Sequence, residues 1–395
     1  MKKLTGLLFA SMLLLTACGG APGGGGSVGG NSAVIGNKVD GDKIKIGLNL
    51  ELSGPVAGYG NQEKEGAELA VKEINADGGI KGKQIELVSK DNKSDTAEAA
   101  TVTANLTTKD KVVAIVGPAT SGDTKAIIPN TTKAKVPTIT PSATDDSITV
   151  INDKVQEYVF RTGFQDSFQG VILANYAQNN LKAKNAIIIG DVSSDYAKGL
   201  TKSFKETYKG EIVADEKFNQ KDKDFKAVLT KIKDQDFDVL YIPGYYEEAG
   251  LIIKQAREMG IKQPILGADG FSDEKLIDVA DAKNMNDIYY TAHFSELAPS
   301  SDRVKAFIEN YTKDYKKAPS SFSALAYDSV YMIKDSLEKA KDLDSQSLTD
   351  ELTKLKDFDG VTGKMSMDKN HNPEKAVVVV KVENGKQVSA DVVQP

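Results

Sequence analysis

Short apolar runs and amphipathic segments alternate along the chain from Lys43 onward. Residues 43–50 form the first apolar run and predict a strand. The segment 61–76 carries Ala and branched apolar residues at i, i+3, i+4 and i+7, which is the spacing of one buried helical face. Gly78 and Gly79 end that helix. This alternation is typical of parallel α/β units.

The same pattern predicts two consecutive sets of such units. In the first set, we expect further strands at 84–88, 112–116 and 138–140, and helices at 94–108 and 121–134. The second set begins near residue 158, with strands at 186–189, 212–218, 239–242, 265–266 and 288–292, and helices starting near 194, 224, 247 and 273. Near the end, apolar runs at 376–382 and 388–393 flank Asn384-Gly385, which predicts a hairpin.

Two such sets predict an α/β protein with two doubly wound, Rossmann-like lobes. Ligands in such sheets bind beyond the carboxyl ends of the strands. Hydroxyls, tyrosines and one carboxylate gather at these ends, namely Ser121, Ser142, Thr144, Tyr196, Tyr245 and Asp269. The sequence therefore predicts a polar site with aromatic walls at this edge.

Each of these residues also has a purely structural interpretation. Ser121 lies where a strand gives way to a helix, so it is either an N-cap or part of an anion site at the helix start. Ser142 and Thr144 could simply form a Pro-Ser turn. Asp269 lies between small residues at a strand end, where it either makes an Asx-turn or accepts an ammonium group.

The N-terminus has the features of a bacterial lipoprotein signal. Lys2 and Lys3 precede an apolar run over 4–15, and Leu15-Thr16-Ala17-Cys18 contains the chain's single cysteine. The run is too short to span a bilayer. We expect residues 1–17 to be removed and Cys18 to receive diacylglycerol, whereas an ordinary signal peptide is the alternative. Residues 18–42 are glycine-rich at first and predict a flexible linker.

Composition narrows the possible partners and cofactors. The chain has 395 residues and a formal charge of −6, and no basic face indicates nucleic acid. With Cys18 lipidated, neither a disulfide nor a thiolate metal site can form. We predict no metal and no cofactor. Of the two histidines, we expect His293 to be structural and His371 to be exposed in a turn.

Several motifs resemble the leucine/isoleucine/valine-binding proteins of ABC transporters. They include Ser53-Gly54-Pro55-Val56-Ala57-Gly58-Tyr59-Gly60, Val116-Gly117-Pro118, Thr140-Pro141-Ser142-Ala143-Thr144 and Gly360-Val361-Thr362-Gly363. The resemblance implies a type I periplasmic-binding-protein architecture with three crossing segments. We expect one lobe to comprise 43–163 and 292–370, and the other 164–291 and 371–395.

The resemblance also implies roles for individual residues. Ser121, Ser142, Ala143 and Thr144 would hold the ligand's α-carboxylate and ammonium. Tyr59 and Phe322 would line one side of the ligand, and Tyr196 and Tyr245 the other. Asp269 stands in Gly267-Ala268-Asp269-Gly270, where the family's prototype has glutamate.

The expected function is therefore capture of branched-chain amino acids by a monomer that delivers them to an ABC transporter permease, anchored to the membrane by Cys18. A buried zwitterion needs both charges paired. No arginine lies in these motifs, which argues against an acidic or phosphorylated ligand. An amide- or urea-binding sensor on the same fold is the alternative. An enzyme is disfavoured because nucleophile-elbow, phosphate-loop and dinucleotide motifs are lacking.

Overall fold

The computed structural model describes residues 36–299 and 301–394. The predicted signal sequence, Cys18 and most of the predicted linker lie outside the described residues. Among the described helices, none combines the length and the hydropathy needed to cross a membrane.

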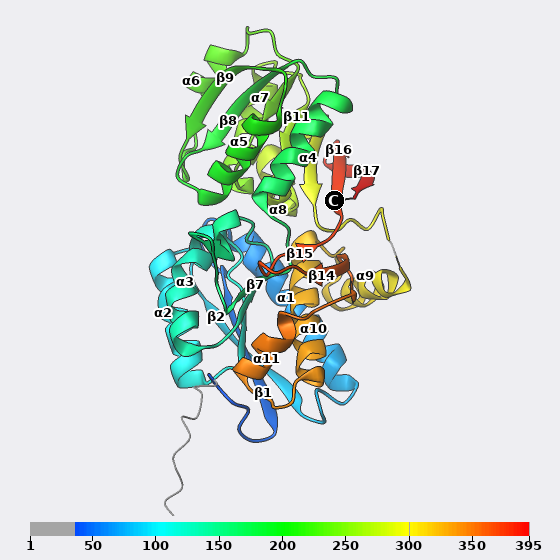
Figure 1. Ribbon diagram of the computed structural model, residues 1–395. Helices are drawn as coiled ribbons and strands as arrows, with labels where there is room; N and C mark the ends of the chain where they lie inside the picture. The colour runs from blue at the N-terminus through cyan, green and yellow to red at the C-terminus, as the bar shows by residue number, and fades with distance from the viewer. Residues whose placement is uncertain (1–35, 300, 395) are drawn as a thin grey trace, which may run out of the picture. The chain divides into compact units, whose positions relative to one another are not determined.

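The first lobe is built on a parallel sheet with strand order β2-β1-β3-β4-β7 (Figure 1). Its strands are β1 (Lys43–Leu50), β2 (Gln84–Asp91), β3 (Ala114–Val116), β4 (Thr138–Thr140) and β7 (Val159–Arg161). Its first helices are α1 (Ala57–Ala76), α2 (Thr96–Asn105) and α3 (Ser121–Ala134), and a small hairpin joins β5 (Val150–Ile151) to β6 (Lys154–Val155). Because helices cover parallel sheets, β1 buries Ile44, Ile46, Leu48 and Leu50 completely.

The second lobe contains a sheet with strand order β17-β16-β12-β11-β10-β8-β9. Its strands are β8 (Asn185–Asp191), β9 (Glu211–Phe218), β10 (Val239–Tyr241), β11 (Ile265–Gly267), β12 (Ile288–Ala292), β16 (Val377–Glu383) and β17 (Lys386–Val393). Its helices are α4 (Asp166–Asn179), α5 (Asp195–Thr207), α6 (Lys226–Ile232), α7 (Tyr246–Glu258) and α8 (Glu274–Ala280). Strand β16 pairs antiparallel with both β12 and β17, and the other pairs in this sheet are parallel. The predicted two-lobed α/β fold is confirmed.

Between β12 and β16 the chain returns to the first lobe. This return contains α9 (Asp302–Tyr315), α10 (Ser321–Lys339), α11 (Ser345–Leu352), β13 (Phe358–Gly360), β14 (Gly363–Met367) and β15 (Pro373–Glu374). Helix α10 packs along α1 (Figure 1). The alternation of strands and helices gave no prediction for these elements, because helix follows helix here.

The chain passes between the lobes at three places within the described residues. These crossing segments are 162–165 after β7, 293–299 after β12 and 375–376 after β15. Residues 37–39 of the expected linker lie against the first lobe, where the side-chain amide of Asn37 donates to the carbonyls of Thr107 and Val112, 2.8 Å from each.

Most predicted elements lie where the pattern places them, with differences at their ends. The helix predicted from 61 begins at Ala57, and the one predicted to reach 108 ends as α2 at Asn105 before a π-helical turn. The predicted hairpin is confirmed, since Asn384 and Gly385 take φ values of 50° and 72° between β16 and β17, as a type I′ turn requires.

The prediction for His371 was wrong. This residue is only 6 % exposed, its ring stacks on Phe160 at 4.2 Å, and its Nδ1 lies 3.0 Å from the carbonyl oxygen of Val159. The turn that contains it folds back onto β7, which the local sequence does not indicate.

Gly66 allows α1 and α10 to approach closely. A Cβ atom there would lie 1.9 Å from the carbonyl oxygen of Ser323. We expect Gly66→Ala to lower the melting temperature, because overpacking costs about 1–3 kcal/mol and alanine regains only ~1 kcal/mol over glycine in a helix. Differential scanning calorimetry measures this effect.

Gly122→Ala is the matched control in α3. The nearest atom to a Cβ there is 3.9 Å away, so the melting temperature should stay the same or rise. Equal melting temperatures for the two variants would contradict a close crossing at Gly66.

Candidate functional site

A small cavity lies between the two lobes at the carboxyl ends of their strands. It is lined by Tyr59, Ala119, Ser121, Ser142, Tyr196, Tyr245, Asp269, Gly270 and Phe322. The structure thus brings together most of the side chains singled out from the sequence, four from the first lobe and three from the second. Ala143 and Thr144 lie beside it, next to Ser142, and both are buried.

In the first lobe, the loop after β4 is held by hydroxyls rather than left open. The N–H groups of Thr144 and Asp145 donate to Ser121 Oγ at 3.3 and 3.1 Å, and that of Ala143 donates to Thr140 Oγ1 at 3.1 Å. Ser121 Oγ accepts both of its bonds, so its own proton is free to donate to another acceptor. Ser121 is therefore the group here that can donate into the cavity.

Arg161, at the end of β7, supports the same loop from behind. It is fully buried and its Nη atoms donate to the carbonyls of Ala143 and Asp145 at 3.3 and 2.8 Å. A cationic guanidinium behind the loop favours negative charge on the cavity side. The sequence motifs gave no indication of this arginine.

Glu51 occupies the approach to the start of α3. Its carboxylate accepts from the N–H groups of Ala119 and Thr120, both at 3.0 Å, so these amides serve the protein itself. Burial and the charge of Glu51 raise the pKa of the neighbouring Asp123 to about 9, which keeps Asp123 protonated at neutral pH.

Glu63 on α1 forms a chain of hydrogen bonds with Ser142. Ser142 Oγ lies 2.5 Å from Glu63 Oε1 and 2.9 Å from the carbonyl oxygen of Ala119. A hydroxyl has one proton and the Ala119 carbonyl can only accept, so Glu63 must supply the other proton. Burial raises the pKa of Glu63 well above its usual range, in agreement with a neutral carboxylic acid.

In the second lobe, three donors converge on the carboxylate of Asp269. Tyr196 Oη and Gln169 Nε2 lie 2.8 and 3.0 Å from Oδ1, and His293 Nε2 lies 3.1 Å from Oδ2. Burial lowers the pKa of His293 to about 4, so the ring is neutral and donates through Nε2. Asp269 is 2 % exposed. Its carboxylate is thus held in place at the cavity wall.

The neighbours of Asp269 fix its orientation. Gln169 Oε1 accepts from Asp269 N–H at 3.0 Å and from Thr291 Oγ1 at 2.7 Å, which directs Gln169 Nε2 to the carboxylate. Burial raises the pKa of the nearby Asp166 well above its usual range, and the charge of Asp269 adds to this shift. Asp166 is therefore neutral beside Asp269.

Aromatic rings from both lobes enclose the cavity. Tyr59 stacks on Phe322 at 4.3 Å, and Tyr196 stacks on Tyr245 at 5.0 Å. Tyr59 also bridges the lobes, because its hydroxyl donates to the carbonyl of Gly270 at 2.7 Å and accepts from the N–H of Tyr246 at 3.1 Å. The rings leave a small apolar space with polar groups at its two ends.

Some of these groups could have been found in the sequence. Glu51 directly follows β1, so the strand-end rule that selected Asp269 applies to it as well. Glu63 lies four residues before Ala67, on the buried face of the same helix. An ionisable residue on such a face indicates a functional or hydrogen-bonded position. His293 directly follows the predicted strand 288–292, so the strand-end rule applies to it too. Gln169 gives no such sign, since only the folded chain brings it to Asp269.

The cavity offers one carboxylate in one lobe and one free hydroxyl donor in the other. Such a pair suits a small molecule that carries a positive charge at one end and an acceptor group at the other, with an apolar part against the rings.

Comparisons with known proteins agree with this chemistry. A family profile described as "Periplasmic binding protein" matches residues 43–387. The Leu/Ile/Val-binding protein BraC3 of Rhizobium johnstonii is 32% identical over 355 residues, which are 88% of this chain and 94% of the relative.

Solved structures are similar as well. The branched-chain amino acid transporter substrate-binding protein LivJ of Streptococcus pneumoniae, in complex with isoleucine, is 53% identical with a TM-score of 0.86, over 89% of this chain and 100% of that one. The leucine-binding protein LivK of Thermotoga maritima is 33% identical with a TM-score of 0.84, over 89% and 99%.

The protonation of Glu63 can be tested through the pH dependence of stability. A carboxyl whose folded pKa lies above its unfolded pKa stabilises fully below the unfolded value, about 4.5, and this contribution is lost as pH rises toward the folded pKa. Glu63→Gln keeps a neutral donor and lacks this loss. We expect its melting temperature to rise relative to the unmodified protein between pH 5 and pH 8.

Glu86→Gln is the matched control on β2, where Glu86 is partly exposed and pairs with Lys43 at 3.1 Å. It should show no such rise. A constant difference between Glu63→Gln and the unmodified protein across this pH range would mean that Glu63 is charged.

Proposed function

The chain belongs to the Leu/Ile/Val-binding group of the periplasmic binding protein family and is an extracytoplasmic solute-binding protein, and we propose that it captures leucine, isoleucine and valine for delivery to an ABC transporter permease. The observation that carries the proposal is the placement of Asp269 and Ser121 in opposite lobes around one small cavity with aromatic walls.

In this proposal each end of the amino acid meets its complement. Asp269 accepts the α-ammonium, and the hydroxyl of Ser121 donates to the α-carboxylate, with the positive charge of Arg161 behind the loop of Ser142, Ala143 and Thr144. Pairing of both charges offsets the cost of removing a zwitterion from water. The aliphatic side chain packs against Tyr59, Tyr196, Tyr245 and Phe322.

Contacts that join the two lobes would enclose the amino acid in the cavity. We assign residues 43–163 and the return as far as β15 to one lobe, and residues 164–292 and 377–394 to the other, because β12 and β16 pair in the second sheet whereas β15 pairs with β14. Besides Tyr59, Lys125 on α3 reaches across to Asp195 on α5, with Nζ 2.8 Å from Oδ2. These contacts form when the lobes close, so ligand release requires hinge opening.

Asp269→Ala tests the proposed role most directly. It leaves the α-ammonium buried without its partner, and such losses cost about 3–5 kcal/mol. At about 1.4 kcal/mol per tenfold, calorimetry should show isoleucine and leucine affinity reduced by roughly two to four orders of magnitude. Asp269→Glu should weaken binding less, because the charge stays while the added methylene crowds the ligand.

The control is Asp278→Ala on α8, whose carboxylate is 69% exposed and which should bind normally. Because Asp269 also accepts from three buried donors, circular dichroism must first show that the alanine variant is folded. Affinity within threefold of the unmodified protein would refute the assignment. Tighter binding of uncharged amides than of leucine would instead select the amide-binding alternative.

We further propose that lipidated Cys18 anchors the protein to the cell membrane. Cys18→Ala should leave ligand affinity unchanged but release the protein from washed membranes, because membrane affinity of a lipoprotein comes from the buried methylenes of its lipid. Fractionation followed by immunoblotting measures the released share. Retention of the variant equal to that of the unmodified protein would contradict lipid anchoring at this residue.

A further inference from the structure

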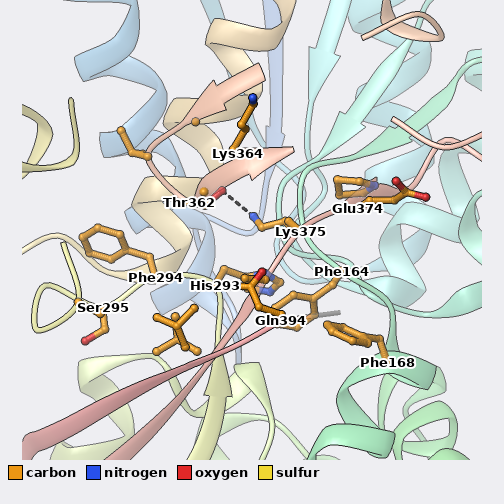
Figure 2. A pocket seen from close by; sticks show the side chains of 18 of the residues that line it. Phe164, Phe168, His293, Phe294, Ser295, Thr362, Lys364, Glu374, Lys375 and Gln394 are labelled. Atoms are coloured by element: carbon orange, nitrogen blue, oxygen red, sulfur yellow. Dashed lines mark hydrogen bonds between the residues drawn. The ribbon is translucent and has the colours of Figure 1, made fainter. Parts of the chain in front are cut away.

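A second and larger cavity, of about 710 Å³, lies at the three crossing segments. Buried residues of all three segments contribute to its wall, among them Phe164, His293 and Lys375, which Figure 2 shows. Neither the ligand chemistry nor the lobe contacts described above use this space. Because every crossing segment lines it, a molecule bound there would touch the whole hinge.

The walls of this hinge cavity combine apolar side chains with polar ones, which include the carboxyl groups of Asp359, Asp368 and Glu374. Phe164, Phe294, Val361 and Val378 line it, and each is under a tenth exposed. Phe168 on α4 also lines it and stays half-buried, with its ring edge-on to Phe164 at 5.9 Å. Val361 comes from the first lobe and Val378 from the second. A hydrocarbon group in the cavity would therefore contact both lobes.

Lys375 supplies a cationic donor to the hinge cavity. It is 3 % exposed. Its Nζ donates to Thr362 Oγ1 at 2.6 Å (Figure 2) and to the carbonyl of Thr162 at 3.3 Å. An ammonium group has three protons, so one remains for another acceptor. Burial lowers the pKa of Lys375 to about 7 against the attraction of Asp328, so a bound anion would favour its charged form.

The carboxylate of Asp328 does not use that third proton. It accepts from the N–H groups of Val361 and Thr362, each at 2.8 Å, and from the hydroxyl of Thr362 at 2.6 Å. The acceptor oxygens of Asp328 are therefore satisfied by donors of the first lobe.

His293 supplies an acceptor close to Lys375. Its Nε2–H donates to Asp269, so Nδ1 carries a lone pair, and this atom is buried without a partner among the described residues. Lys375 lies near enough that its charge lowers the pKa of His293. An unpartnered buried acceptor at a cavity wall requires a donor from something that occupies the cavity.

We propose that the hinge cavity binds a small aliphatic 2-hydroxycarboxylic acid. Its carboxylate accepts a hydrogen bond from the third N–H of Lys375, and its hydroxyl donates to His293 Nδ1. Its hydrocarbon part packs against the phenylalanines and valines. An apolar acid without the hydroxyl satisfies Lys375 alone, and an amino acid brings a second cation toward Lys375.

The same imidazole couples the hinge cavity to the cleft. His293 contacts Asp269 through Nε2 and stacks on Phe164 at 3.7 Å, so it belongs to both sites. An occupant that contacts both lobes stabilises their closed arrangement and should raise affinity for the cleft ligand. This coupling rests on the proposed function, and by linkage it is reciprocal.

Calorimetric titration of leucine-saturated protein with 2-hydroxy-4-methylpentanoate tests the site, because leucine blocks the cleft. We expect one further site, with weaker binding of 4-methylpentanoate, which lacks the hydroxyl. Lys375→Met should weaken binding at least tenfold. The control Lys364→Met removes a 66% exposed lysine at the same cavity that pairs with Asp357 at 2.9 Å, and it should bind normally.

Ala298→Trp keeps the test decisive if Lys375→Met does not fold. Ala298 lies half-buried in a crossing segment at the cavity wall, and an indole there would fill the space and abolish binding. The chain has no other tryptophan, so its emission also reports the local environment. The proposal would be overturned if the unmodified protein gave no heat of binding with the hydroxy acid. It would also be overturned if Lys375→Met and Ala298→Trp bound the hydroxy acid as tightly as the unmodified protein does.

The coupling is measured as leucine affinity with and without saturating 2-hydroxy-4-methylpentanoate. A severalfold increase supports it, and no change or a decrease refutes it. If the protein binds the hydroxy acid in a Lys375-dependent manner but no branched-chain amino acid, the proposed function fails and the hinge site stands. Leucine binding without hydroxy-acid binding refutes only the hinge site.

Discussion

Burial of the Asp269 carboxylate is the constraint around which the second lobe is arranged. A buried carboxylate without donors costs several kcal/mol, and here three donors come from three different elements: Gln169 on α4, Tyr196 on α5 and His293 after β12. Their convergence fixes how these elements meet at the end of β11. The ligand-facing charge is thus part of the lobe's own packing, and its position is set before any ligand arrives.

Three other acids around the cleft avoid the same cost by holding a proton, whereas Glu51 stays a carboxylate that accepts from two backbone N–H groups. Burial raises the pKa of Glu63, Asp123 and Asp166, and the hydrogen bonds of Ser142 agree with a neutral Glu63. Without this, the cleft would carry several negative charges and would favour inorganic cations over a zwitterion. Protonation leaves Asp269 as the carboxylate that faces the cavity from the second lobe, opposite the hydroxyl of Ser121. The pattern of neutral and charged acids is therefore what suits the cleft to an amino acid.

The sequence predicted the fold well where one signal repeats. Strands such as β1 and β8 are continuous apolar runs, and the Asn384-Gly385 turn dictates its own hairpin. The sequence pattern predicted none of the helices α9 to α11, because consecutive helices do not follow the alternation of strands and helices. Strand-end residues such as Ser121 and Asp269 were found because parallel sheets bring those ends together. Gln169 and Arg161 were not, since Gln169 lies a hundred residues before Asp269 and Arg161 supports a loop that folds back beside it. His293 follows a predicted strand, but the contact of its ring with Asp269, 24 residues earlier, depends on the folded chain.

The contacts of Tyr59 show that the lobes are joined by weak interactions, so that ligand binding can set the balance between open and closed arrangements. It belongs to α1 in the first lobe, yet both of its hydrogen-bond partners, Gly270 and Tyr246, lie in the second. Each such bond contributes about 0.5–1.5 kcal/mol net, and a partly exposed ion pair such as Lys125 with Asp195 about 0–1 kcal/mol. These contacts sum to a few kcal/mol, which is comparable to the cost of removing the Asp269 carboxylate from water when no ammonium group is bound opposite it. Under the proposed function, open and closed arrangements are then close in free energy, and a zwitterion that pairs with Asp269 and Ser121 together shifts the equilibrium to the closed one.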